Sequence, residues 1–482
     1  MASCHVLTSP GPCGNGEESH RRFTIHDDPL CCTKTLYDVY ALSRKEEPPF
    51  VSEPWMVAMR TSPVLGTTSQ SSNFRLSIRG RTLSAAAIEK MKKNFAMDQP
   101  AVVIDTGSFL TKAGYGGDSS PRITFQTRVG RARIPANPSV LQPKDWFIGD
   151  ELSCVGRNRL EYRSTFDGDG IVADWDNMEK IWRHSFYTEL RTAPEGVAVL
   201  LTEPPLNPKA ERERLAQIMF DAFSVPALYV GIHPVLGLYA SGRTTGLVVE
   251  SGSISSYTVP IVDGNAIPHA VQRLGVAGRD ISDAMMDIIR RSNDFDPLAY
   301  YDQEIVRDIK EKLAVVSLDY DSDIRSGNLQ QRSYELPDGN EITICNELLH
   351  CAEVLFRPSL VGKRAAGIHA CAFETLSEVE QDYHSALFAN VLLCGGTTKT
   401  TGFAERMAQE LRSLAHSSAS SCTIVAPDDR QYSAWLGGSV LSALSTFREM
   451  CVTKVEYEEH GASVVHRKCG GAQAQKADVS LC

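Results

Sequence analysis

One seven-residue pattern occurs twice in this chain of 482 residues, and it constrains the fold more than any other feature. Residues 102–108 read VVIDTGS, and residues 247–253 read LVVESGS about 145 positions later. Each copy is an apolar, β-branched run followed by an acidic residue, a small polar residue, Gly and Ser, which predicts a buried strand entering a tight turn. The period is too long for a solenoid and indicates two duplicated domains. Two such hairpins facing each other could surround an anion with backbone N–H donors.

Apolar side chains recur at helical spacing between and after the two copies, which predicts an α/β architecture. The expected core-facing stripes are Ile181, Trp182 and Phe186; Leu215, Ile218, Met219 and Phe223; and Ile305, Ile309, Leu313 and Val316. Residues 390–414 are expected to pass from a strand through Gly395 and Gly396 into a helix, and residues 435–444 to open a second helix. Glycines at such places let the backbone approach a ligand. Taken alone, however, the pair Gly395–Gly396 or the pair Gly437–Gly438 is explained equally well by a turn needed for packing.

The first 98 residues differ from the rest in composition. They lack sustained periodicity and are rich in Gly, Pro, Ser and Thr, so we expect a low-complexity, disordered extension over residues 1–98. The net charge of -10 argues against a nucleic-acid binder, which needs a basic surface. No apolar run approaches the roughly 20 residues that cross a bilayer, and residues 1–15 do not read as a signal peptide. The scattered cysteines are therefore expected to be reduced thiols.

From residue 100 onward the sequence resembles the actin superfamily almost without gaps. The matching segments are EPPLNPK (203–209), LYASGRTTG (238–246), AGRD (277–280), IVRDIKEKL (305–313), YELPDG (334–339), GGTT (395–398) and VHRKC (465–469). VLLCGG (391–396) and YEEHG (457–461) look more like the testis-type actin-like and actin-related proteins, so the chain resembles a divergent actin-like member. The resemblance implies the actin fold, a class shared with Hsp70 and sugar kinases, over residues 99–469, with a short tail at 470–482.

The resemblance also implies a cleft that holds ATP or ADP with Mg²⁺ or Ca²⁺ between two related α/β domains. The first phosphate hairpin would contain Asp105, Gly107, Ser108 and Lys112, with Asp105 holding the metal through water. The second hairpin would contain Glu250, Ser251, Gly252 and Ser253. The nucleoside side would be lined by Gly278, Arg307, Lys310, Glu311, Gly395, Gly396 and Thr397.

Several residues depart from the family pattern around this cleft. Phe109 and Ile254 replace the second glycine of each hairpin, and we expect them to resist a left-handed turn and to crowd the phosphates. Ser253 replaces an aspartate that helps to hold the metal's water shell in the family. His233 and Tyr257 stand where the family has a water-positioning Gln and a His; His233 could orient a water or be structural. Thr400 and Gln431 replace a Tyr and a Lys on the adenine side.

These departures predict an actin-like structural or interaction protein with a degraded hydrolytic site, rather than an active ATPase. The alternatives are a filament-forming ATPase and, far behind it, a sugar-kinase or Hsp70-like enzyme. Residues 134–143 match the loop that inserts into the next subunit of an actin filament, and we call them the insertion loop. Pro135, Pro138 and Pro143 stiffen this loop, which argues against filament formation. Partners are expected to be other actin-family or actin-binding proteins, with the cytoplasm and cytoskeleton, or else the nucleus, as location. They would dock in a groove lined by Tyr239, Val440, Leu441, Leu444 and Met450.

Overall fold

The computed structural model describes residues 77–78, 81–82, 99–133, 145–154, 160–292, 300–326, 331–336, 339–344, 347–415 and 422–469. All of them belong to one compact unit, Arg75–Cys482. Most of the predicted extension, the insertion loop at 134–143 and the tail at 470–482 lie outside the described residues. Within the extension, strands β1 (Ser77–Ile78) and β2 (Arg81–Thr82) pair antiparallel, a piece of regular structure that the sequence did not predict.

The first large sheet contains the first copy of the repeated pattern. Its strand order is β19 (Val452–Thr453), β10 (Ala227–Ile232), β9 (Val199–Glu203), β3 (Val102–Thr106), β4 (Leu110–Tyr115) and β5 (Ile123–Gln126). Strands β3 and β4 form an antiparallel hairpin, while β3, β9 and β10 run parallel. A smaller sheet orders β7 (Trp146–Ile148), β6 (Val129–Ala132) and β8 (Leu160–Arg163). We call the part of the chain built on the first large sheet the first lobe.

The second large sheet repeats this arrangement around the second copy of the pattern. Its order is β13 (Asn265–Ala266), β12 (Ser256–Val262), β11 (Gly246–Ser251), β17 (Val391–Cys394) and β18 (Ile424–Val425), and β14 (Gln272–Leu274) also pairs with β12. Strands β11 and β12 form the antiparallel hairpin, and β11, β17 and β18 run parallel. The duplication predicted from the sequence is therefore confirmed. This sheet and its helices form the second lobe, which also carries the hairpin of β15 (Arg332–Glu335) and β16 (Glu341–Ile344).

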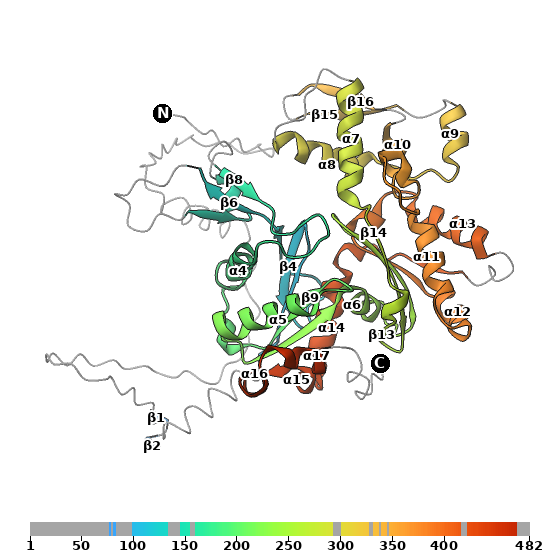
Figure 1. The fold of residues 1–482 in the computed structure, drawn as a ribbon. Coiled ribbons are helices and arrows are strands. Elements are labelled where there is room, and N and C mark those ends of the chain that lie inside the picture. The colour runs from blue at the N-terminus through green and yellow to red at the C-terminus, as the bar shows by residue number, and fades with distance from the viewer. Residues whose placement is uncertain are drawn as a thin grey trace, which may run out of the picture. The chain divides into compact units, whose positions relative to one another are not determined.

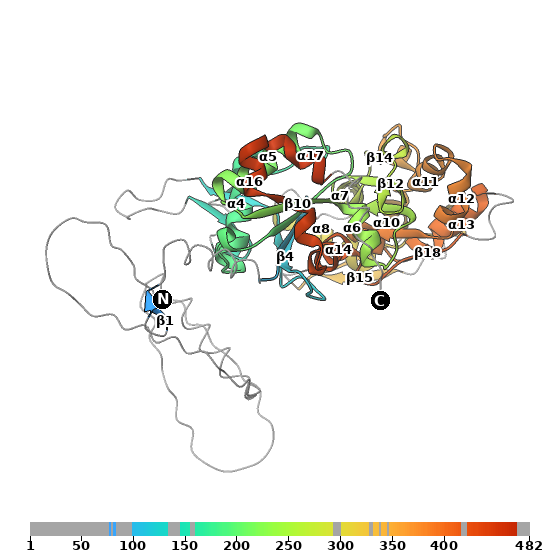
Figure 2. The same cartoon turned by 90° about the horizontal axis from the view of Figure 1, so that it is seen from below.

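Helices accompany each sheet (Figures 1 and 2). The first lobe has α3 (Glu151–Cys154), α4 (Trp175–Arg183), α5 (Lys209–Gln217), α15 (Phe447–Met450), α16 (Lys454–His460) and α17 (Val465–Lys468), and α4 and α5 each continue into a π-helical turn. The second lobe has α7 (Gly278–Ser292), α8 (Tyr300–Leu313), α9 (Tyr320–Ser326), α10 (Glu347–Glu353), α11 (Ile368–Ser377), α12 (Gln381–Phe388) and α13 (Phe403–Ala415). The predicted stripes are buried or half-buried. Because α8 ends at Leu313, however, Val316 lies in the following loop and pairs with Thr401 instead.

Two helices that carry the chain between the lobes pack against each other. Helix α6 (His233–Ala240) leads from β10 to β11, and α14 (Ser433–Ala443) returns toward β19 (Figure 1). Their backbones touch at Gly437, where a Cβ atom would lie 1.8 Å from the carbonyl oxygen of Leu236. Gly237 is also constrained, because its Cβ would lie 2.8 Å from Cys394 Sγ. Only glycine permits so close a crossing.

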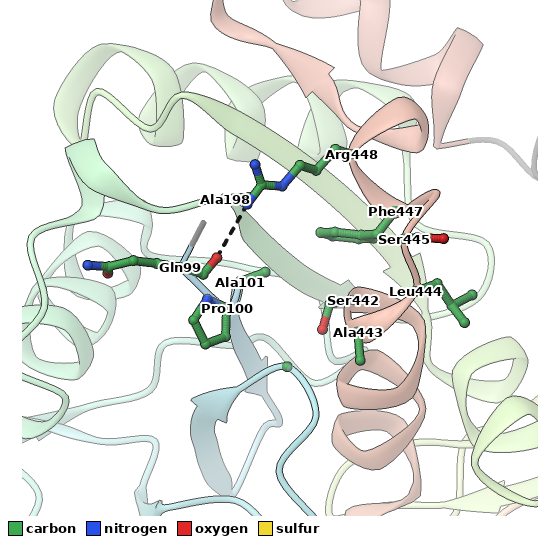
Figure 3. Close-up of a pocket in the computed structure, with 11 residues that line it drawn as sticks. Gln99, Pro100, Ala101, Ala198, Ser442, Ala443, Leu444, Ser445, Phe447 and Arg448 are labelled. Atoms are coloured by element: carbon green, nitrogen blue, oxygen red, sulfur yellow. Dashed lines mark hydrogen bonds between the residues drawn. The ribbon is translucent and has the colours of Figure 1, made fainter. Parts of the chain in front are cut away.

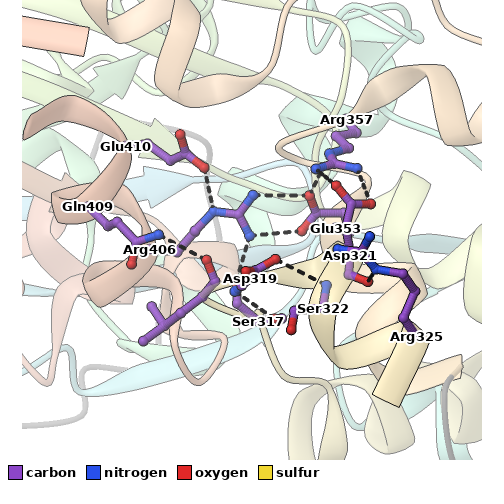
Figure 4. A network of polar contacts seen from close by, with 11 residues as sticks. Ser317, Asp319, Asp321, Ser322, Arg325, Glu353, Arg357, Arg406, Gln409 and Glu410 are labelled. Atoms are coloured by element: carbon purple, nitrogen blue, oxygen red, sulfur yellow. Dashed lines mark hydrogen bonds and ion pairs between the residues drawn. The ribbon is translucent and has the colours of Figure 1, made fainter. Parts of the chain in front are cut away.

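Each lobe has its own apolar core, and the second also contains a buried ion pair. Arg406 on α13 is 4% exposed and donates from Nη1 and Nη2 to the carboxylate of Glu353 on α10, at 3.2 and 3.1 Å. Its Nε donates to Glu410, and its Nη1 also donates to the Ser317 carbonyl oxygen (Figure 4). Arg357 adds a second cation 3.1 Å from Glu353. The network joins α10, α13 and the loop before α9.

Replacing Arg406 with Met should destabilise the second lobe, because it leaves the Glu353 charge buried with one partner fewer. We expect a loss of about 3–5 kcal/mol in the free energy of unfolding, measured by urea denaturation. Burial already raises the pKa of Glu353. A raised folded-state pKa means that stability falls as pH rises, so the loss should be larger at about pH 8 than at about pH 5. Arg325→Met, at an exposed site, is the control. Equal losses in both variants would contradict a stabilising role for the buried ion pair.

Candidate functional site

A cavity of about 840 Å³ is lined by residues of both lobes. It lies where the carboxyl ends of parallel strands meet, the usual place for a ligand in α/β proteins. Asp105 stands at the end of β3 and His233 directly after β10 in the first lobe, and Glu250 stands near the end of β11 in the second. The predicted cofactor residues all line the cavity except Ser251, which is buried and hydrogen-bonds to Ser256.

The centre of the cavity wall is a compact polar cluster, which we call the carboxylate cluster. Lys112 Nζ donates to Asp105 Oδ2 at 2.8 Å, and Thr202 Oγ1 donates to Asp105 Oδ1 at 2.7 Å. His233 Nε2 lies 3.0 Å from Thr202 Oγ1 and 3.4 Å from Asp105 Oδ1. On its other side, His233 Nδ1 lies 3.8 Å from Glu250 Oε1. The imidazole ring thus stands between the carboxylates of the two hairpins.

The two carboxylates differ electrostatically. Burial alone would raise the pKa of Asp105, but the charges of Lys112 and His233 and the hydrogen bonds from Lys112 and Thr202 hold it below its ordinary value. Burial raises the pKa of Glu250, and the charge of Asp105 raises it further against the opposing effect of His233. Glu250 Oε2 is buried and makes no hydrogen bond to any residue that the structure describes. The second hairpin therefore holds the carboxylate that is harder to ionise.

The two hairpin turns form without the strain that the sequence suggested. Neither Phe109 nor Ile254 has a positive φ angle, so neither adopts the left-handed conformation that both were expected to resist. Phe109 does line the cavity, where the Arg307 guanidinium lies 4.2 Å from its ring centroid. Ile254 does not line it; its side chain is 6% exposed and packs within the core of the first lobe. The prediction that Ile254 crowds the phosphates is therefore wrong, because the side chain points into the opposite lobe's core.

Cations gather in this cavity more than in the chain as a whole. Seven Lys or Arg residues line it against five Asp or Glu residues, although the chain carries a net charge of -10. The sequence indicated three of these cations but not Arg128, Arg279, Lys399 and Arg430. It also gave no place to Thr202, although the position of this threonine near the end of the apolar run 199–203 repeats the pattern of the two hairpin strands. This repeated pattern is the sequence signal from which Thr202 could have been predicted as a site residue.

Both hairpin turns offer unpaired backbone donors to a ligand. The amides of Ser108 and Ser253, which line the cavity, make no hydrogen bond within the described residues. Gly395, at φ +84°, lies so close to the second hairpin that a Cβ would be 2.2 Å from Ser251 O. Thr397 Oγ1 donates to Gly252 O at 2.7 Å and fixes this approach. Free N–H groups, a cation excess and a volume of this size fit a nucleotide, with its phosphates at the hairpins.

A divalent metal fits this site poorly. Both oxygens of Asp105 already accept hydrogen bonds, and the His233 ring stands between Asp105 and Glu250. In the part of the chain that the structure describes, no group of three or more His, Cys, Asp or Glu side chains could hold a metal ion. The metal role expected for Asp105 is therefore not supported by its surroundings.

Contacts across the cavity tie the lobes together. Gln126 on β5 donates to Glu304 on α8 at 3.1 Å, and Arg128 lies 3.9 Å from the same carboxylate. Elsewhere, Arg273 on β14 pairs with Asp169 of the first lobe at 2.8 Å. These pairs join residues far apart in the sequence, and we call the Gln126–Arg128–Glu304 group the lobe clamp.

Two further surface features lie outside this cavity. In the predicted groove, Val440 is 43% exposed and Tyr239, Leu444 and Met450 are half-buried. Leu441 is 5% exposed and belongs to the core, so its expected place in the groove is wrong. A second cavity of about 370 Å³ lies beside Gln99, whose carbonyl oxygen accepts a hydrogen bond from Arg448 Nη2 at 3.5 Å (Figure 3).

The fold and this cleft define a two-lobed α/β protein with a polar cavity at a duplicated pair of hairpins. Residues 96–470 match the model of the family described as Actin. The match covers well over half of the chain, and the protein belongs to the actin family. Among the described residues, no helix is both long and apolar enough to cross a membrane.

Glu304→Ala should loosen the lobe clamp, because it removes the hydrogen-bond acceptor of Gln126 and the carboxylate that pairs with Arg128. We expect faster amide hydrogen exchange in β5 and α8, with a change of only about 1 kcal/mol in the free energy of unfolding. Glu311→Ala on the same helix is the control, since that side chain is 57% exposed and pairs with Arg307 of its own helix at 3.7 Å. Unchanged exchange in Glu304→Ala would show that the clamp does not hold the lobes.

Proposed function

We propose that this chain is a structural and interaction protein of the actin family that holds ATP or ADP in its cleft without turning it over. Nucleotide binding, the first part of this proposal, is supported by the unpaired backbone amides of Ser108 and Ser253, one on each hairpin, beside an excess of cationic side chains. Charge-assisted bonds from such donors and from Lys112 would hold the phosphates, and Gly278 and Glu311 would face the nucleoside.

Slow or absent turnover follows from the two residues at the water-positioning places. Hydrolysis needs a water held in line with the terminal phosphate, and positioning supplies much of the rate in phosphoryl transfer. His233 is engaged with Thr202, Asp105 and Glu250. Tyr257 is 6% exposed, and burial raises the pKa of its phenol. Neither side chain is arranged to hold and activate a water.

The organisation and location of the protein would follow from the same class. The extension at 1–98, the actin-like part at 99–469 and the tail at 470–482 would act as three regions of one cytoskeletal protein of the cytoplasm, with the nucleus as the alternative. Partners would be other actin-family or actin-binding proteins, docking near Val440, Tyr239, Leu444 and Met450.

The purified protein should release phosphate from ATP at an undetectable rate or far below that of actin. Phe109→Gly with His233→Gln should raise the rate by about tenfold or more, because the pair frees space beside the first hairpin and supplies an amide for the water. Ile254 is left unchanged, since removing its buried side chain would cost about 2–5 kcal/mol of stability. His466→Gln is the control. An actin-like rate in the unmodified protein would refute the proposal.

The protein should also fail to form a homopolymer in salt and Mg²⁺ that polymerise actin. The physical reason is the three prolines of the insertion loop, which fix backbone dihedrals and remove amide donors. Sedimentation and light scattering measure this directly, with conventional actin as the positive control. Filaments with a low critical concentration would favour the alternative, a filament-forming ATPase.

A further inference from the structure

We propose that the cleft takes its nucleotide as the free polyphosphate anion, with no divalent cation, because the His233 ring occupies the place between the two hairpin carboxylates. This inference rests on the proposed function and specifies the form of its ligand. It concerns the interior of the carboxylate cluster, where residues of both lobes meet.

The position of the ring is fixed from both sides. Nε2 lies 3.4 Å from Asp105 Oδ1 and 3.0 Å from Thr202 Oγ1, whereas Nδ1 lies 3.8 Å from Glu250 Oε1. His233 is the first residue of helix α6 and immediately precedes Pro234, so the backbone has little freedom to move the ring to another position. A hydrated Mg²⁺ keeps several waters and needs octahedral oxygen ligands around it. A five-membered ring in contact with both carboxylates leaves no such shell between them.

The oxygen donors that would anchor those waters are also engaged. Asp105 Oδ2 accepts from Lys112 and Oδ1 from Thr202, at 2.8 and 2.7 Å. At its turn the second hairpin offers Ser253, whose hydroxyl carries no charge. Glu250 Oε1 lies 3.8 Å from His233 Nδ1, and Glu250 Oε2 is buried without a hydrogen bond among the described residues; one such carboxylate does not make a cation site.

Protein side chains can replace the charge that a metal would supply. Lys112 reaches the first hairpin, and Lys310 lies on the opposite wall, where its Nζ donates to Gly278 O at 3.1 Å. Arg279 and Arg307 line the same cavity. Lysine and arginine bind phosphate through charge-assisted hydrogen bonds, so a polyphosphate could be neutralised by these groups alone.

The test is calorimetric titration of the full-length protein with ATP, once with Mg²⁺ and once with EDTA. Binding should be tighter with EDTA than with excess Mg²⁺, by about tenfold or more, because Mg²⁺ complexes free ATP and lowers the concentration of the form that the cleft takes. As a second readout, the electron paramagnetic resonance spectrum of Mn²⁺ with ATP should show no additional protein-bound species. His233→Gln should make binding cation-dependent, with Mg²⁺ tightening it by about tenfold or more, because a shorter neutral amide opens the gap. His466→Gln, which alters a His–Glu pair at 2.9 Å outside the cavity, should behave as the unmodified protein.

Two results would overturn the inference, and they are distinguishable. ATP binding that requires Mg²⁺ in the unmodified protein, or a protein-bound Mn²⁺ signal, would mean that His233 moves aside to admit a cation; nucleotide binding would then stand. Absence of ATP and ADP binding under both conditions would overturn both the inference and the binding half of the proposed function. Thermal unfolding of each variant with and without ATP identifies any variant that fails to fold.

Discussion

The close crossing of helices α6 and α14 is the constraint on which the rest of the structure depends. Both passages of the chain between the lobes run through these helices, and Gly437 lets them touch at the Leu236 carbonyl. Helix α6 begins with His233, and α14 begins beside Gln431, which also lines the cavity. The element that joins the lobes therefore also sets the distance across the cleft. A side chain larger than hydrogen at residue 437 would change both at once.

Duplication then explains why polar groups converge at one place. Each lobe ends its parallel strands on the same side, so Asp105, Thr202 and His233 of the first lobe face Glu250 of the second. In this chain the converging groups are neutralised mainly by one another. Part of the second hairpin's turn also serves in core packing, because Ile254 is buried in the other lobe's core. The cleft keeps the donors for an anion while its central groups are engaged in holding the lobes together.

The sequence was sufficient for the parts of the fold that depend on periodicity and on chain order. The strand at 102–106 and the strand at 246–251 followed from apolar runs ending in turn residues, and the stripe around Phe186 followed from helical spacing. The direction in which each side chain points could not be predicted from the sequence. Val440 and Leu441 are neighbours, and only the register of α14 shows that one is exposed and the other buried. Long-range partners such as Gln126 and Glu304 leave no local signal, because nothing in either segment identifies the other.

The claim that the cleft holds a nucleotide and leaves it intact is tested most directly by identifying the nucleotide that stays bound to the protein. Protein purified rapidly without added nucleotide and incubated with excess ATP would be freed of unbound ligand by gel filtration. Acid extraction and chromatography would then identify what remains after a long incubation. We predict intact ATP, in an amount close to that of the protein. Recovery of ADP as the main species would contradict the claim of an inactive site, and recovery of neither would contradict the claim of binding.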